Sequence, residues 1–274
     1  MRSVMKSRLK VLFKIKLIIL LFLAGLVIVS AVFPAINKAC QPVSARNRCN
    51  RIKMLWLRVF GRILRLRTEI DGQAVDGPAI IVANHISWLD IVALGEHLPG
   101  YFVAKSDILN WPVIGFISRQ VGTIFVARGD KQTIHMTTEQ MSWLLKQDSK
   151  VFAFPEGTTT DGSEVLPFHS SLLQPALLTR SAIQPVSLHY HGEAKSLAPF
   201  IGDDEFVPHL LKILTLDTIH VTLRLLPVLD CVDKNRQQLC KEARGLIQEA
   251  LEPSGVNCPD SAPIQAYRKK LSAS

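Results

Sequence analysis

Three short apolar runs in this sequence end at side chains that could do chemistry. The first run exits into Asn84 and His85, and Asp90 follows the histidine by five positions. If a helix begins near Ser87, Asp90 lies about one turn inside it and can accept one imidazole N–H, which leaves the other ring nitrogen basic. That is the orientation of a general base. The alternative is a histidine that caps or fills the start of a helix.

The second apolar run, Gly122–Ala127, ends at Arg128. A guanidinium at the end of a strand is free to hold an anion, and it can bind a phosphate through two parallel hydrogen bonds. The alternative is an exposed arginine that binds nothing specific.

The third run, Val151–Ala153, leads into the stretch Phe154–Gly162, "FPEGTTTDG". Gly157 lets another group approach the backbone closely, and Thr158 and the two threonines after it offer N–H and hydroxyl donors. Glu156 is a lone carboxylate where the strand is expected to leave the core. The composition of this loop is typical of a site that binds a polar group.

Short apolar runs alternate with helical patterns from residue 69 onward, which predicts an α/β domain with a mixed, mostly buried sheet flanked by helices. In open α/β sheets ligands bind at the carboxyl ends of strands, where the three polar stretches lie. The expected strands are Ala79–Ala83, Tyr101–Ala104, Thr123–Val126, Val151–Phe154, Ile183–Tyr190 and His220–Leu226. The expected helices are Trp88–His97, Val113–Val121, Gln132–Lys146, Ser170–Arg180 and Arg236–Leu251.

The charge of the chain is distributed unevenly. The formal net charge is +9, yet residues 1–68 hold 15 lysines and arginines and no acidic residue. The other residues carry 17 basic and all 23 acidic side chains, so their net charge is −6. Basic segments of this kind bind nucleic acids or anionic membranes. The apolar residues beside them favour a membrane over a nucleic acid.

A run of 17 uncharged residues, Leu17–Phe33, lies within the basic segment. It makes roughly 25 Å of helix, short of the usual span of about 20 residues, and Val11, Leu12 and Phe13 could supply the rest. We expect a retained membrane helix that either spans the bilayer or dips into it; a cleaved signal peptide is the alternative. The positive-inside rule does not choose an orientation, because six basic residues precede the run and five follow it within about 20 residues. These residues are Arg2, Lys6, Arg8, Lys10, Lys14 and Lys16 before it, and Lys38, Arg46, Arg48, Arg51 and Lys53 after it.

A second helix is expected from about Arg48 to Arg67. Its apolar side chains share one face and its arginines gather beside them, which is the pattern of a helix lying in a lipid interface. An amphipathic helix packed on the core of the domain would show the same pattern. The apolar face comprises Ile52, Leu55, Trp56, Val59, Ile63 and Leu66.

Four stretches, in this order and spacing, resemble the sequence blocks of the glycerolipid acyltransferase family, which includes bacterial 1-acylglycerol-3-phosphate (lysophosphatidate) acyltransferases. They are "NHISWLD", "GTIFVAR", "FPEGTTT" and "IQPVSLHY", and the resemblance covers about residues 81–190. The H-x4-D and F-P-E-G-T motifs are its most specific part. An apolar N-terminal helix before these blocks is also common in that family.

The resemblance implies a role for each candidate residue. His85 would be the general base that takes the proton of a lysolipid hydroxyl, and Asp90 would orient it and stabilise the imidazolium. The hydroxyl would attack the thioester of acyl-CoA or acyl carrier protein directly, with no acyl-enzyme and no cofactor. Lys105 would hold the thioester oxyanion or a phosphate. The residues implied to bind the acceptor headgroup are Arg128, Glu156, Gly157, Thr158 and Thr159, and Glu156 would either contact the acceptor or fix the loop.

Two departures from the family pattern concern the acceptor. Many lysophosphatidate enzymes have an arginine directly after E-G-T, where this chain has Thr159, and F-K-x-G is replaced by "PFHSSLL" at residues 167–173. Both features resemble the lyso-ornithine lipid acyltransferases, whose acceptor carries an amino acid headgroup. We expect lysophosphatidate as the acceptor, which gives phosphatidate in phospholipid biosynthesis, with lyso-ornithine lipid as the alternative.

Two other classes of protein are alternatives. A zinc hydrolase would use His189 and His191, which share one face of a strand, together with His85. No carboxylate or cysteine at suitable spacing completes that site, so no metal is expected. A lipid-binding membrane protein without catalysis would not need an oriented base. The five cysteines include no C-x-x-C pair and are expected to be reduced.

Three regions are expected along the chain: basic membrane-anchoring helices over residues 1–68, an α/β acyltransferase domain over 69–258, and a polar tail over 259–274. Acyl-CoA and acyl carrier protein are cytoplasmic. We therefore expect the protein at a bacterial inner membrane, in contact with membrane lipids, with its catalytic domain on the cytoplasmic side.

Overall fold

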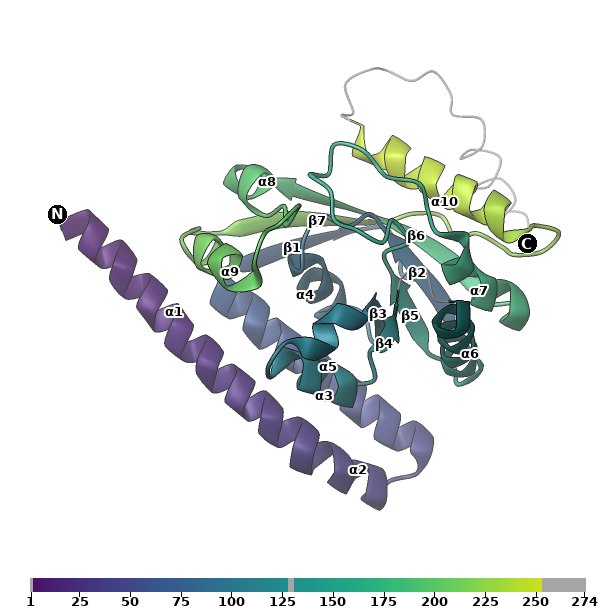
Figure 1. Cartoon of the computed structure of the whole chain (residues 1–274), viewed down its shortest axis with the longest axis horizontal. Coiled ribbons are helices and arrows are strands. Elements are labelled where there is room, and N and C mark those ends of the chain that lie inside the picture. Colours follow the sequence, from purple (N-terminus) through teal and green to yellow (C-terminus); the bar gives the residue numbers. More distant parts are fainter. Residues whose placement is uncertain (1, 128–130, 253–274) are drawn as a thin grey trace.

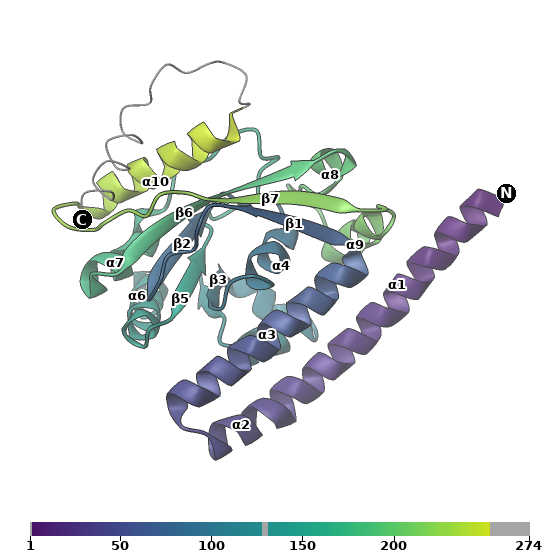
Figure 2. The same cartoon turned by 180° about the vertical axis from the view of Figure 1, so that it is seen from behind.

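The computed structural model describes residues 2–127 and 131–252, and Figures 1 and 2 show the chain from two opposite sides. Two long helical segments at the N-terminus lie side by side, and a sheet with helices on both faces follows them. The N-terminal elements are α1, Arg2–Val27; a π-helical turn, Ile28–Val32; α2, Phe33–Ala39; and α3, Pro42–Leu64.

Aromatic side chains hold α1 and α3 together. The ring of Trp56 on α3 meets Phe22 on α1 edge-on, with the ring centroids 5.2 Å apart. The indole N–H of Trp56 donates to the carbonyl of Leu21 at 3.0 Å. Farther along α3, Phe60 and Leu64 are buried in the same core as the sheet residues. The N-terminal helices and the sheet therefore share one apolar core.

The sheet has seven strands in the order β1-β7-β6-β2-β5-β3-β4. Neighbouring strands are parallel except for β6 and β7, so β1 and β7 run opposite to the other five strands. The strands are β1, Leu66–Asp71; β2, Ala79–Ala83; β3, Tyr101–Lys105; β4, Ile124–Val126; β5, Lys150–Ala153; β6, Ala182–His191; and β7, Ile219–Leu225.

The central strand β2 is buried on both faces, so all five of its residues are apolar. Because side chains alternate along a strand, Ile81 and Ala83 belong to the core that contains α4, Leu89–Gly95. Ile80 and Val82 belong to the core on the other face. The helices of that second face are α6, Lys131–Lys146; α7, Gln174–Thr179; and α10, Arg236–Leu251. Figure 1 shows α10 and α3 on opposite sides of the sheet.

The mixed sheet flanked by helices is confirmed, and each of the six expected strands is present, with its ends shifted by no more than one residue. The helix expected over Arg48–Arg67 begins earlier, at Pro42, because proline is favoured in the first turn of a helix. It ends at Leu64, because Arg65 adopts a left-handed conformation with φ of 65°. The expectation that the helix reaches Arg67 is therefore wrong, and these last residues begin β1.

The elements that the sequence did not predict include the strand β1 and the helix α9. The strand β1 lies at the edge of the sheet, and only Leu66 among its six residues is buried, so it carries no apolar run. The helix α9, Phe206–Leu214, has a proline in its first turn, which conceals its apolar pattern. The remaining short helices are α5, Ile114–Gln120; α8, Glu193–Leu197, which the sequence also did not predict; and two 3-10 helices, Ser106–Asn110 and Ser170–Leu173.

The N-terminal helix is apolar on its outer surface as well as on the surface that contacts α3. A stretch of 31 residues, Leu9–Ala39, is long and apolar enough to cross a membrane. Its most apolar 18 residues have a mean hydropathy of 2.9, and 22% of them are buried. Large apolar side chains of α1 that are more than half exposed are Leu9, Leu12, Phe13, Ile19, Leu20, Leu23 and Val27. This surface supports association with a membrane.

Candidate active site

His85 is held where β2 leaves the sheet. The strand ends at Ala83, and the side chain of Asn84 then bonds to both backbone groups of Leu188 on β6, at 3.1 Å through its amide N–H and at 2.8 Å through its carbonyl oxygen. The chain therefore turns out of the sheet at a fixed point. His85 follows directly, at the carboxyl end of the strand.

The carboxylate of Asp90 orients the imidazole, as the spacing of the two residues predicted. Asp90 lies in the first turn of α4 and is fully buried. Its Oδ2 accepts from Nδ1 of His85 at 2.8 Å, and also from the backbone N–H groups of Ile86 at 2.7 Å and Ser87 at 2.9 Å. A carboxylate only accepts, so Nδ1 carries the hydrogen and Nε2 keeps its lone pair.

The second nitrogen of His85 remains available for proton transfer. Within residues 2–127 and 131–252, Nε2 has no hydrogen-bond partner, and the side chain is 19% exposed. The ring of Phe154 stacks on the imidazole, with centroids 4.0 Å apart and an angle of 13° between the planes. This contact and the bond to Asp90 fix the ring from two directions, so the geometry can serve a general base.

Glu156 connects the His85 loop with the loop that follows β5. One carboxylate oxygen accepts the backbone N–H of His85 at 2.8 Å, and the other accepts that of Leu166, also at 2.8 Å. Burial raises the pKa of Glu156, while the two N–H donors act in the opposite direction. Of the two roles expected for this residue, the contacts favour fixing the loop.

The expected headgroup residues differ in what they contact. Gly157 has a φ of 68°, a conformation that suits glycine, and it lines the cavity described below together with Thr158. The hydroxyl of Thr159 donates to the carbonyl of Phe200, and the N–H of Thr160 donates to the carbonyl of His85 at 2.8 Å. Several donors of this loop therefore bind the protein itself. Arg128 lies outside the described residues.

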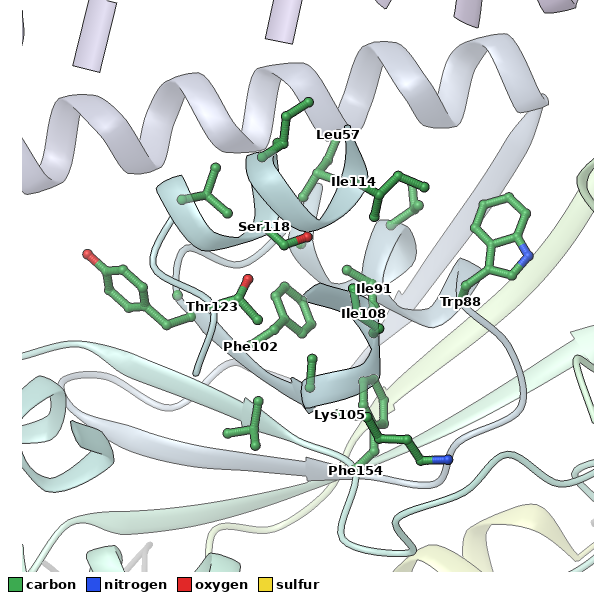
Figure 3. Close-up of a pocket in the computed structure, with 18 of the residues that line it drawn as sticks. Leu57, Trp88, Ile91, Phe102, Lys105, Ile108, Ile114, Ser118, Thr123 and Phe154 are labelled. Atoms are coloured by element: carbon green, nitrogen blue, oxygen red, sulfur yellow. The ribbon is translucent and has the colours of Figure 1, made fainter. Parts of the chain in front are cut away.

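An apolar cavity of about 660 Å³ opens beside His85. In the view of Figure 3, Lys105 and Phe154 lie at one end of this cavity, and Leu57 and Ile114 lie at the other. Lys105 is the last residue of β3, so it stands at the carboxyl end of a strand neighbouring β5. The cavity brings His85, Lys105, Gly157, Thr158 and Thr159 together.

Lys53 belongs to the basic segment of residues 1–68, but its side chain points toward the interior of the protein. The amine of Lys53 on α3 donates to the carbonyls of Gly100 at 3.2 Å and Val121 at 3.3 Å, and lies 4.0 Å from the centre of the Tyr101 ring. Burial lowers its pKa to about 8. Lys53 also lines the cavity. The sequence pattern could not show this, because Lys53 lies among residues that look solvated.

Tyr190 is the last residue of the fourth sequence block, and the sequence alone indicates no role for it. Its hydroxyl donates to Oδ1 of Asp90 at 2.7 Å, and both residues are buried. No sequence signal besides its place in "IQPVSLHY" marks it.

The two histidines of the zinc alternative, His189 and His191, have ring centroids 4.6 Å apart. In the described part of the chain, no group of three or more histidine, cysteine or acidic side chains could hold a metal ion.

Comparisons with known proteins agree on one family. The family model described as Acyltransferase matches residues 64–189. A lyso-ornithine lipid O-acyltransferase of Pseudomonas aeruginosa is 32% identical over 203 residues, which is 73% of this chain and 78% of that protein. The protein of the same name from Brucella abortus is 34% identical over 223 residues, 73% of this chain and 83% of the relative. A 1-acyl-sn-glycerol-3-phosphate acyltransferase of Neisseria gonorrhoeae is 28% identical over 183 residues, 65% of this chain and 72% of the relative.

A solved structure has the same fold. The crystal structure of the 1-acyl-sn-glycerophosphate (LPA) acyltransferase from Thermotoga maritima aligns with a TM-score of 0.66, and the alignment covers 95% of this chain and all of the other. The two sequences are 18% identical, so the likeness concerns the fold.

Proposed function

The chain belongs to the acyltransferase family, and from that premise we propose that it transfers a fatty acyl group from a thioester to the hydroxyl of a lysolipid, with His85 as the general base. The observation that carries this proposal is the His85–Asp90 pair beside a large apolar cavity. A protein that only bound lipids would not need an imidazole held by a buried carboxylate.

The reaction proceeds in one displacement. Nε2 of His85 removes the proton of the lysolipid hydroxyl as its oxygen attacks the thioester carbonyl carbon. A C–O bond forms, the C–S bond breaks, and the departing thiolate takes the proton back from the imidazolium. Asp90 stabilises the imidazolium while it exists. Lys105, at the end of β3, is suited to stabilise the negative charge that develops on the carbonyl oxygen.

The apolar cavity fits the chemistry of the acyl group. Its walls include Phe102, Ile108 and Ile114, and its volume of about 660 Å³ lies in the range of cavities that enclose a small molecule. The donor is acyl-CoA or the thioester of acyl carrier protein, both of which act as co-substrates. The chemistry requires no further cofactor, because the thioester is already activated.

Two acceptors are consistent with the site. Lysophosphatidate agrees with the sequence blocks and with the name of the Neisseria relative. Lyso-ornithine lipid is favoured by two observations: the relatives named for it include those at 32% and 34% identity, and Thr159 stands where an arginine would meet a phosphate. We give lyso-ornithine lipid as the second candidate function. The two headgroups differ in charge, which makes them separable by experiment.

The protein acts at a membrane, and the finer location is an inference from its substrates. Acyl-CoA and acyl carrier protein are cytoplasmic, and lysolipids lie in the bilayer. We therefore place the catalytic domain on the cytoplasmic side of a bacterial inner membrane. The exposed apolar surface of α1 supports the contact with lipid.

Substitution of Thr159 separates the two acceptors by the sign of its effect. Thr159→Arg should raise kcat/KM for lysophosphatidate, because the added charge attracts the phosphate, and lower it for lyso-ornithine lipid, because it repels the ammonium group. Thr159→Val is the matched control, since it also loses the bond to Phe200 but adds no charge. Wild-type kcat/KM on each acceptor identifies the preferred one. Equal effects of the two variants on both acceptors would show that residue 159 does not face the headgroup.

A further inference from the structure

Tyr190 forms the third link of a hydrogen-bonded chain that begins at His85. Its hydroxyl donates to Oδ1 of Asp90 at 2.7 Å, while Oδ2 of the same carboxylate accepts from Nδ1 of His85 at 2.8 Å. We propose that Tyr190 is a positioning residue for the acyl transfer, which fixes the carboxylate of Asp90 so that Oδ2 faces the imidazole. This inference rests on the function proposed above.

The length of β6 explains how Tyr190 reaches the site. β2 pairs with β6 only as far as Ala83 and Val186, whereas β6 continues to His191 alongside β7. Side chains alternate along a strand, so Val186, Leu188 and Tyr190 share the face that packs in one core with α4. The bonds between Asn84 and Leu188 join this extension to the loop that carries His85. The extension of β6 therefore brings Tyr190 to the first turn of α4.

The two oxygens of Asp90 are held in different ways. Oδ2 has two backbone donors besides the imidazole, but within the described residues Oδ1 has only Tyr190. Burial and the neighbouring carboxylate raise the pKa of Tyr190 well above its usual value, so its hydroxyl keeps the proton that it donates. Without this hydroxyl, Oδ1 would be a buried oxygen with no partner, and the carboxylate could rotate.

The hydroxyl also affects the uptake of a proton by the His85–Asp90 pair. The pair has a net charge of −1 when the imidazole is neutral and of zero when the imidazole is protonated. A hydrogen-bond donor to Asp90 stabilises the negatively charged state more than the neutral one. Removing the donor therefore moves proton uptake to higher pH. Glu156 also interacts with the pair, and its oxygens bind the N–H groups of His85 and Leu166, which this change does not alter. Lys105 and His169 line the same cavity as His85 and are likewise unchanged.

Tyr190→Phe tests the proposal, because it removes the hydroxyl and keeps the ring. We expect kcat to fall about 10- to 100-fold, with the KM for the lysolipid within about twofold. We also expect the acid limb of kcat/KM to move up by about one pH unit. Ser181→Ala is the matched control, since it removes another hydrogen-bonded hydroxyl, that of the residue directly before β6, which is bonded to the hydroxyl of Thr179 at 2.8 Å.

A spectroscopic measurement on the full chain in detergent does not depend on turnover. The Nδ1 proton of His85 should give a downfield proton resonance, identified by its loss in His85→Ala, and Tyr190→Phe should shift it while Ser181→Ala does not. An unchanged resonance and an unchanged acid limb in Tyr190→Phe would overturn the proposal, even if kcat fell through lost stability. If the wild type transferred no acyl group, the proposed function would fail, and the resonance would still decide the role of Tyr190.

Discussion

At the scale of single residues, Glu156 shows how a motif residue can act through the backbone. Its position in F-P-E-G-T left open whether it contacts the acceptor or fixes the loop. The structure has both carboxylate oxygens on backbone N–H groups, one of which belongs to His85. The sequence shows where the carboxylate lies along the chain. The path of the loop over residues 157–166 determines which N–H groups donate to it.

Substitution of Glu156 has a consequence for stability that depends on pH. Glu156→Gln replaces one acceptor oxygen by an amide NH2 and leaves a backbone N–H unsatisfied, which costs about 1–3 kcal/mol. The pKa of Glu156 is raised above its ordinary value of 4.5, so the native state binds a proton more tightly than the unfolded state. Protonation of Glu156 at low pH therefore raises the free energy of unfolding of the wild type. Glutamine does not titrate, so Glu156→Gln lacks this gain.

We thus expect the wild type to be more stable than Glu156→Gln at neutral pH, and the difference to widen as the pH falls through the raised pKa toward 4.5. Midpoints of thermal unfolding in detergent, measured for both proteins across this range, provide the test. A difference that narrows as the pH falls would contradict the sign of the shift.

At the scale of secondary-structure elements, the N-terminal helix has two apolar surfaces with different partners. Ile18 and Phe22 pack into the core, whereas Leu20 and Leu23 are 64% and 54% exposed. The amphipathic pattern of α3 was open to two interpretations, a helix in the lipid interface or a helix on the core. The burial of Phe60 and Leu64 favours the second interpretation for that end of α3.

Charges on the outer surface of α1 should detach the protein from lipid. Leu20→Glu combined with Leu23→Glu places two carboxylates where lipid is expected, and a charge in the apolar part of a bilayer costs about 2.5–3.5 kcal/mol. We expect binding to anionic vesicles to fall more than tenfold in a cosedimentation assay, with the unfolding midpoint in detergent unchanged. Val232→Glu is the control, because Val232 is 63% exposed and lies outside α1. Equal vesicle binding by the double variant and the wild type would refute a lipid-facing α1.

At the scale of the whole molecule, the sequence predicted the sheet and the His85–Asp90 contact better than it predicted the other residues around His85. Apolar runs ending at polar residues located six strands, because buried strands must be apolar. The spacing of His85 and Asp90 predicted their contact, since both lie within one strand-to-helix turn. Tyr190 and Lys53 could not be placed, because their contacts join residues 100 and 47 positions apart or more. Edge strand β1 was missed for lack of an apolar run.

The most direct test of the central claim is transfer of a labelled acyl group from acyl-CoA to a lysolipid by the wild type and by His85→Ala. The wild type should form the diacyl product with lysophosphatidate or lyso-ornithine lipid. His85→Ala should lose about 10²- to 10⁴-fold in kcat, because it lacks the general base, while its unfolding midpoint and vesicle binding stay unchanged. A His85→Ala protein that kept more than about a tenth of the wild-type rate would contradict the proposal that this histidine takes the proton of the acceptor.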